Sequence, residues 1–317
     1  MLGSMMIVML AAVGRAPVAP PVGLRKIMVP ILGVMLGSGF HPNLFDHIGD
    51  WVVTLAILPI YVAAAFASSM LFYRKIGGYD PVTAYFSSAP GGLNEMITLG
   101  GEAGGDERRI ALAHASRIFL VVTFVGFFYA AFLHISVAGD ARPFVNFSDV
   151  PLRDLAILAA CAVLGAYLGP LFKIPAAPIL GPMILSGAVH LSGITGSAPP
   201  SLAVNAAQLV MGTVIGCRFL GSRPAEILKD MSLAAGAAGS MLCIALGTAF
   251  FVSYLTGVGV QQTFLTFSPG GLAEMSLLAL ALNADIAYVA TIHIARIVLV
   301  IAFAPLAFRL LGWKNVS

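Results

Sequence analysis

The stretch Pro90-Gly91-Gly92-Leu93-Asn94-Glu95-Met96 recurs 179 residues later as Pro269-Gly270-Gly271-Leu272-Ala273-Glu274-Met275. Each copy is followed at the same spacing by an aspartate, a histidine and an arginine: Asp106, His114 and Arg117, then Asp285, His293 and Arg296. Between residues 85–121 and 264–300, 14 of 37 aligned positions are identical without a gap. Most of the shared residues are costly in an apolar segment, so the chain consists of two copies of one unit.

The composition around these motifs is that of a membrane protein. Hydrophobic residues make up 59% of the 317 residues, charged residues only 10%, and the mean hydropathy is +0.96. Backbone groups inside lipid have no water to bond, so long apolar runs must form helices. Runs long enough to cross a hydrocarbon core of about 30 Å include Trp51–Tyr73, Leu155–Leu171, Ser232–Thr256 and Ala287–Phe308.

The distribution of basic residues predicts the topology. Thirteen of them fit on one side of the membrane, which is then cytoplasmic, if each Pro-Gly-Gly segment enters and leaves from the same face. The two segments, 81–101 and 260–282, are then re-entrant hairpins of two half-helices. Only Arg142 and Arg153 fall on the opposite side. The alternative, a broken helix that crosses fully, gives a parallel repeat and conflicts with the charge pattern.

We therefore predict an all-α integral membrane protein with two inverted-topology repeats. It has about nine transmembrane helices and two re-entrant hairpins, an arrangement typical of secondary transporters. The predicted divisions are repeat 1 at residues 1–137, an extracytoplasmic linker at 138–152 and repeat 2 at 153–312. The helix near residues 153–171 has no counterpart in repeat 1, so we expect one amino-terminal helix to be missing, either lost or omitted by a late start codon.

The Pro-Gly-Gly break frees backbone amides in the middle of an apolar segment. The half-helix that follows presents unpaired N–H groups and its positive dipole end, which suit a carboxylate or another anion. The alternative is a packing kink or a close helix crossing permitted by glycine. Arg117 and Arg296 each lie 11 residues into a helix opened by an aspartate, about 16 Å deep, and need a partner or a ligand there. They can pair with Glu95 and Glu274 as structural bridges, bind an anion, or do both in turn.

The candidate site residues follow from these considerations. Predicted to bind substrate are Gly91, Gly92, Asn94, Arg117, Gly270, Gly271 and Arg296. Predicted to couple protons or cations are the buried carboxylates and the imidazoles three residues before each arginine: Glu95, Glu274, His114 and His293. The histidines can equally be hydrogen-bonded core residues. Asp106 and Asp285 are predicted helix N-caps, and the repeated pairs Gly33/Gly37 and Gly212/Gly216 predict close helix packing within the bundle or in a homodimer.

Several classes of function are excluded or not expected. Cys161, Cys217 and Cys243 lie in apolar segments without paired spacing, and the six histidines are scattered, so we expect neither a metal site nor a cofactor. No soluble basic module exists that could bind nucleic acid, and the net charge is only +3. We do not expect an enzyme. The expected partners are a small anionic metabolite, membrane lipid and a second copy of the chain.

At these motifs the chain resembles the AbrB-type duplicated membrane proteins, a bacterial family built from two copies of one transmembrane module. The Pro-Gly-Gly-Leu-x-Glu-Met hairpins and the His-x-x-Arg-Ile helices carry the resemblance, which extends from Leu2 to Leu311. Members are often labelled as regulators of gene expression or as ammonia monooxygenases. More remotely, the module is similar to the inverted-repeat fold of cation/proton antiporters and bile-acid symporters. The resemblance implies a multi-pass protein of the bacterial cytoplasmic membrane, and the missing first helix departs from the family pattern.

We thus expect a secondary transporter of a small organic anion that works by alternating access, with proton coupling. The alternative is a non-transporting membrane sensor or scaffold that affects gene expression indirectly, in which the same charged cluster only holds the bundle together.

Overall fold

The structure is a computed structural model that describes residues 1–42, 48–132, 144–174, 176–221, 224–282 and 284–312. In these residues the secondary structure is entirely helical, as predicted. Part of the predicted linker, residues 138–143, lies outside the described residues. The α-helices in chain order are α1 (Leu2–Val13), α2 (Val22–Gly37), α3 (Ile48–Lys75), α4 (Pro81–Ser88), α5 (Leu93–Glu102), α6 (Glu107–Phe132), α7 (Leu152–Leu171), α8 (Ala177–Leu191), α9 (Ser201–Gly216), α10 (Pro224–Thr256), α11 (Val260–Phe267), α12 (Leu272–Ala281) and α13 (Ile286–Leu310).

Six of these helices are long and apolar enough to cross a membrane: α3, α6, α7, α9 with the short 3-10 helix Cys217–Phe219 that continues it, α10 and α13. The chain is therefore an all-α integral membrane protein. The prediction of about nine transmembrane helices is reached only if the shorter helices α1, α2 and α8, of 12, 16 and 15 residues, are also counted. At 1.5 Å per residue each covers less than the hydrocarbon thickness when upright.

The chain divides into two compact units, and each takes segments from both sequence repeats. Unit 1 comprises residues 1–48, 129–220 and 276–290; unit 2 comprises residues 49–128, 221–275 and 291–317. The folding units thus do not coincide with the two repeats in the sequence.

Within unit 1 the repeated glycine pairs bring helices of different copies together. A Cβ added to Gly33 or Gly37 of α2 would collide with atoms of α8, and one added to Gly212 or Gly216 of α9 would collide with atoms of α1. Helices α1 and α8 occupy equivalent places in the two repeats. Each copy therefore packs its glycine-bearing helix on the short helix of the other copy, and the prediction of close packing within the bundle is confirmed.

A second close contact in unit 1 joins α7 to α8. A Cβ on Gly165 would run into the backbone of Gly181 and Pro182, and one on Gly181 would run into the Gly165 carbonyl. Leu158 and Cys161 of α7 are buried in the same contact beside Val34 of α2. Small residues allow backbones to approach in lipid, where dispersion contacts replace the hydrophobic effect between helices.

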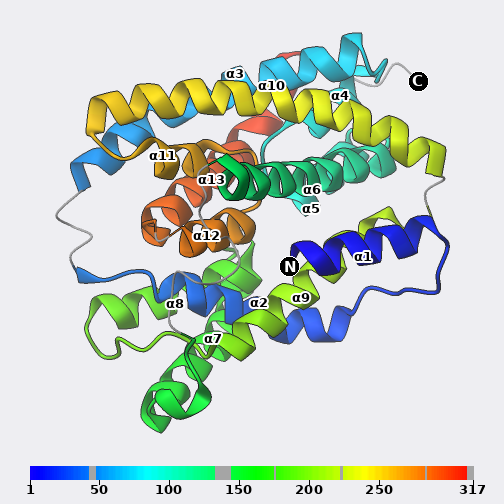
Figure 1. Cartoon of the computed structure of the whole chain (residues 1–317). Helices are drawn as coiled ribbons and strands as arrows, with labels where there is room; N and C mark the ends of the chain where they lie inside the picture. Colours follow the sequence, from blue (N-terminus) through cyan, green and yellow to red (C-terminus); the bar gives the residue numbers. More distant parts are fainter. Residues whose placement is uncertain (43–47, 133–143, 175, 222–223, 283, 313–317) are drawn as a thin grey trace. The chain divides into compact units, whose positions relative to one another are not determined.

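Unit 2 is arranged around two long helices, α3 and α10, which run along each other (Figure 1). Their hydroxyls Ser68 and Ser240 lie 3.3 Å apart, and the Phe72 ring covers Gly236 so closely that no Cβ would fit there. The same unit contains α4, α5, α6, α11, the start of α12 and most of α13, including both Pro-Gly-Gly breaks.

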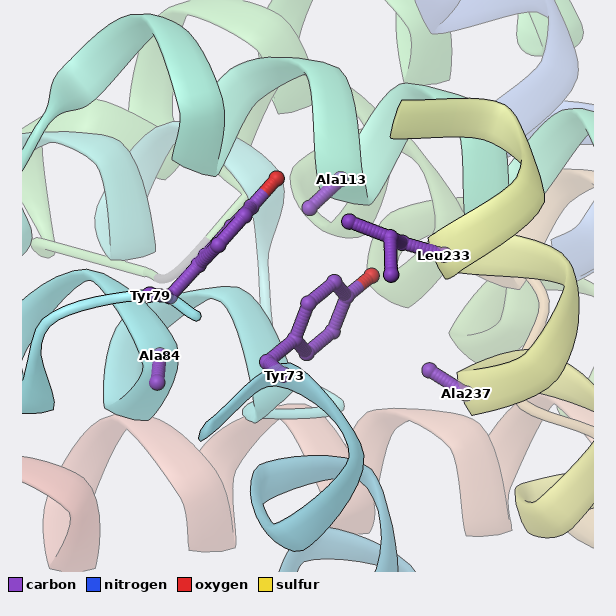
Figure 2. Close-up of a cluster of buried hydrophobic side chains, with 6 residues drawn as sticks. All are labelled: Tyr73, Tyr79, Ala84, Ala113, Leu233 and Ala237. Carbon is purple, nitrogen blue, oxygen red and sulfur yellow. The ribbon is translucent and has the colours of Figure 1, made fainter. Parts of the chain in front are cut away.

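A buried aromatic cluster joins the start of the first broken helix to α10. Figure 2 shows Tyr73 of α3 and Tyr79 of the following loop beside Ala113 of α6 and Leu233 of α10. The Tyr79 hydroxyl donates to the Asp230 carboxylate at 3.1 Å. The Arg109 guanidinium lies over the Tyr79 ring, 5.3 Å from the ring centroid. Burial, and then the charge of Asp230, raise the pKa of Tyr79. The phenol therefore stays protonated and keeps donating at physiological pH.

Candidate functional site

Each Pro-Gly-Gly sequence divides an apolar segment into two short helices. The first broken helix consists of α4 and α5, and the second of α11 and α12. Ala89 and Ser268, which precede the prolines, have ψ angles of 123° and 134°, outside the helical range. Proline disfavours the helical conformation of the residue before it and has no N–H to continue the ladder. The breaks predicted from the sequence are thus confirmed to within a few residues.

The histidine and arginine after each break bind back to the first half-helix of their own copy. His114 Nε2 lies 2.8 Å from the Phe86 carbonyl, and Arg117 donates to the Ala89 carbonyl at 3.2 Å. In the second copy His293 Nε2 lies 3.1 Å from the Leu265 carbonyl, and Arg296 donates to the Ser268 carbonyl at 2.8 Å. Residues 86, 89, 114 and 117 correspond to 265, 268, 293 and 296 by the repeat offset. The two copies therefore use the same contacts.

These contacts assign the arginines a partner that was not predicted. Their guanidinium groups bind the carbonyl ends of α4 and α11, where the helix dipole is negative and the last carbonyls lack helical partners. Arg296 also donates to the Gly270 carbonyl at 2.7 Å. Within the described part of the chain no ion pair joins Arg117 or Arg296 to a carboxylate. Of the alternatives that the sequence left open, the bridges to Glu95 and Glu274 are therefore not formed among the described residues, and backbone carbonyls take their place.

The two copies differ in one respect at this position. Arg117 also donates to Nδ1 of His114 at 3.0 Å, so this ring nitrogen is an acceptor and Nε2 carries the proton. Arg296 directs the corresponding N–H to Gly270 instead, and Nδ1 of His293 has no partner. His114 is fully hydrogen-bonded, whereas His293 retains one buried lone pair.

The two glutamates fold back on the amino ends of α5 and α12. Gly92 and Gly271 stand at the N-cap positions, and a Cβ on either would collide with the carboxylate of the glutamate three residues on. Each acid stands at the third helical position, beside the first turn of its half-helix, where the helix dipole is positive and favours a carboxylate. Glu274 is only 5% exposed and Glu95 is half-buried. The amino end of each half-helix therefore has a carboxylate of the protein itself beside it.

Other predicted residues are placed as follows. Asp106 Oδ1 accepts from the Arg109 amide and Asp285 Oδ1 from the Tyr288 amide, at 3.1 and 3.0 Å, so both are N-caps as predicted. Gly91 and Gly270 lie against Val300 of α13 and Met275 of α12, respectively. Asn94 belongs to α5, but its side chain lies outside the described residues. No group of three or more His, Cys, Asp or Glu side chains gathers anywhere in the described ranges.

Aromatic contacts hold each broken helix on the long helix of the other copy. Tyr85 of α4 packs its ring on Phe308 of α13, with centroids 5.2 Å apart, and Phe264 of α11 packs on Phe128 of α6 at 6.3 Å. Tyr85 and Phe264 are equivalent in the repeat. The first half-helix of each copy thus packs on the long helix of the other copy. Both Pro-Gly-Gly breaks and both buried arginines belong to the same compact unit.

The Tyr85 hydroxyl supports this arrangement with a buried hydrogen bond to the Ala304 carbonyl at 2.7 Å. We expect Tyr85→Phe to lower the free energy of unfolding by about 1 kcal/mol, because the ring packing survives while the bond is lost. Thermal unfolding of the detergent-solubilised protein measures the change. Tyr254→Phe is the matched control, since Tyr254 is 87% exposed; an equal melting temperature for the two variants would contradict the assignment.

Sequence reasoning missed one residue near the arginines. Tyr61 of α3 is 1% exposed, its ring lies edge-on to Phe267 at 5.1 Å, and it interacts electrostatically with both Arg117 and Arg296. The equivalent position in the other copy is Ser240. Because the two copies differ here, the repeat comparison that identified the other residues gives no signal for Tyr61.

Comparison with known proteins identifies the family to which the chain belongs. The family described as "Transition state regulatory protein AbrB" matches residues 1–312. A Bacillus subtilis (strain 168) protein named "Uncharacterized protein YhjN" is 27% identical over 295 residues, 89% of this chain and 77% of that protein. An Escherichia coli (strain K12) protein named "Putative regulator AbrB" is 25% identical over 290 residues, 89% of this chain and 81% of that protein. The chain belongs to the AbrB family.

Proposed function

We propose that the protein is a secondary transporter that moves a small organic anion across the bacterial cytoplasmic membrane by alternating access, with proton coupling. The observation that carries this proposal is the pair of buried arginines beside two broken helices in one unit. An arginine at the centre of a membrane helix costs at least about 2.5–3.5 kcal/mol on insertion scales. Such residues are retained mainly where they serve a pathway or a ligand.

The internal repeat supports a transport mechanism. In the proposed orientation the two copies are inverted in the membrane, and the two broken helices are re-entrant hairpins whose tips carry the Pro-Gly-Gly sequences. Inverted repeats with discontinuous helices are a common design of secondary transporters, because the two halves can exchange conformations. The mirrored contacts of His114 and His293, and of Tyr85 and Phe264, are consistent with such an exchange.

In the proposed site the substrate anion binds near the amides of the tips and the two guanidinium groups. The residues assigned to it are Gly91, Gly92, Asn94, Arg117, Gly270, Gly271 and Arg296. Since the arginines are anchored on backbone carbonyls, their charge is fixed in place before the ligand arrives. A preorganised charge of this kind binds an anion without first ordering long side chains.

Glu95 and Glu274 are assigned to coupling. Their carboxylates stand at the same half-helix ends that would receive the substrate, so a charged glutamate and a bound anion compete for one set of amides. Protonation of the glutamate removes this competition, and proton binding and anion binding then favour each other. His293, with its free lone pair, is the better placed histidine for a part in proton transfer.

One specific prediction tests the coupling. We expect Glu274→Gln to make anion flux independent of an imposed pH gradient, because the amide has a similar shape but never carries the competing charge. Flux of the labelled substrate into proteoliposomes, with and without the gradient, measures this. Glu102→Gln, at the exposed end of α5, is the control and should keep the wild-type response. A gradient response of Glu274→Gln equal to that of the wild type would refute the role of Glu274.

A second candidate function is a non-transporting sensor or scaffold. It is favoured by the carbonyl partners of both arginines, which give these side chains a structural role, and by the word regulator in the name of one relative. Proteoliposomes loaded with a panel of labelled mono- and dicarboxylates separate the two. Saturable flux of any member favours the transporter; no flux and no ligand binding across the panel favours the scaffold.

A further inference from the structure

Among the described residues of unit 2, six buried donors have no hydrogen-bond partner: the hydroxyls of Ser87, Ser116 and Thr123, the Tyr61 hydroxyl, and Nε of Arg117 and of Arg296. The last three belong to Tyr61 and the two arginines with which it interacts. Their side chains are 1%, 6% and 3% exposed, respectively. Buried polar groups in folded proteins nearly always have a partner, and an unpaired one indicates a missing water, ion or ligand. These atoms are therefore available to a ligand that only accepts hydrogen bonds.

The three groups act on one another. Tyr61 interacts electrostatically with Arg117 and with Arg296, and the two guanidinium groups repel each other. Among the described residues no carboxylate pairs with either arginine. Two like charges, one from each repeat, thus share a region of low dielectric without a counter-ion, where their repulsion is strong.

The remaining contacts fix where these donors stand. Arg296 is held by the Ser268 carbonyl at the end of α11, and the Tyr61 ring lies against the neighbouring Phe267. Arg117 is held by Ala89 and His114 at the equivalent end of α4. These bonds use one N–H of each terminal nitrogen, whereas Nε has no partner in either arginine, so at least the Nε–H group of each is left for a ligand.

We propose that Tyr61, Arg117 and Arg296 together bind the carboxylate of a single substrate anion, so that the two repeats serve one shared site rather than one site each. This inference rests on the proposed function and adds Tyr61 to it. Two carboxylate oxygens offer about four acceptor positions, enough for the two Nε–H groups and the phenol. A water would satisfy fewer donors and leave the charge uncompensated, and a cation would be repelled.

The Tyr61 hydroxyl favours a ligand that accepts a hydrogen bond. Because an O–H directed at a carboxylate makes a short, charge-assisted bond, its loss should weaken binding while leaving the shape of the site unchanged. Tyr61→Phe removes this one oxygen and keeps the ring contact with Phe267. It is also the variant most certain to fold, since an unpaired buried hydroxyl gives nothing to stability.

The test is binding of sodium formate and sodium acetate to the purified full-length protein in detergent, followed by thermal unfolding at constant ionic strength with sodium chloride, which has no carboxylate, as the balancing salt. We expect a saturable rise in melting temperature that fits one site per chain, and an apparent Kd about tenfold or more higher in Tyr61→Phe. Tyr85→Phe, whose hydroxyl has a protein partner, should keep the wild-type Kd.

The outcomes separate this inference from the proposed function. No anion-dependent shift in the wild type, two sites per chain, or an unchanged Kd in Tyr61→Phe would overturn the shared site. If proteoliposomes then still transport a carboxylate, only the inference fails. If the shift and its dependence on Tyr61 are observed but no carboxylate crosses the membrane, the shared site stands and the transport function fails.

Discussion

Arg296→Ala is expected to abolish anion flux and to lower the free energy of unfolding by about 2 kcal/mol or more. The variant leaves the Ser268 and Gly270 carbonyls without their donor in a buried position. Each unpaired buried group costs about 1–3 kcal/mol, although relief of the buried charge offsets part of this. Arg117→Ala should act in the same direction, with the Ala89 carbonyl and His114 losing their donor.

Flux in proteoliposomes and thermal unfolding in detergent measure the two effects. Arg109→Ala is the control, because its guanidinium is half exposed and pairs with Asp106 at 3.4 Å. An exposed pair of this kind, with the cation-π contact to Tyr79, is worth about 1 kcal/mol. Wild-type flux in a folded Arg296→Ala protein would show that the guanidinium has no part in transport.

Gly165→Val is expected to have the largest effect on folding, about 3 kcal/mol or more. The new side chain meets the backbone of Gly181 and Pro182, which cannot yield as the end of a flexible side chain can. Overpacking that forces helices apart costs about 1–3 kcal/mol even where side chains can adjust. Helix α7 would have to move away from α8 and lose the buried contacts of Leu158 and Cys161.

Size-exclusion profiles and melting temperatures in detergent measure this effect. Gly247→Val in α10 is the matched control, because a Cβ at that position has no neighbour within 4 Å. The control should melt within a few degrees of the wild type. Equal melting temperatures for the two variants would mean that α7 and α8 are not in the close contact described.

The breaks and caps of the site could be predicted because they depend on local chemistry. At positions 90 and 269 a proline is followed by two glycines, and this combination ends the helix, whereas single prolines such as Pro59 and Pro305 stay inside helices. An aspartate before an apolar run caps a helix. The ends of the helices were harder to predict from the sequence. Helix α10 was expected from Ser232 and begins at Pro224, since an apolar run marks the lipid-buried part of a helix and not its solvated end.

The partners of the arginines could not be predicted. Any buried guanidinium needs acceptors, and the sequence names only the carboxylates, whereas every residue also has a carbonyl. Which carbonyls are free depends on where the helices break and which elements fold back, and this is decided by tertiary contacts. The two compact units could not be predicted either, because each contains segments of both copies and the order of segments along the chain does not show which of them pack together.

The central claim is that the region of the two Pro-Gly-Gly tips is reached from the two sides of the membrane in turn. A single cysteine in place of Ser87, a fully buried residue of the last turn of α4, tests it in a protein whose Cys161, Cys217 and Cys243 are replaced. Labelling rates with a membrane-impermeant thiol reagent are measured from each side, with and without a transported anion. We predict reaction from both sides, with the anion changing the two rates in opposite directions. Reaction from one side only, or from neither in a protein that still transports, would contradict alternating access through these tips.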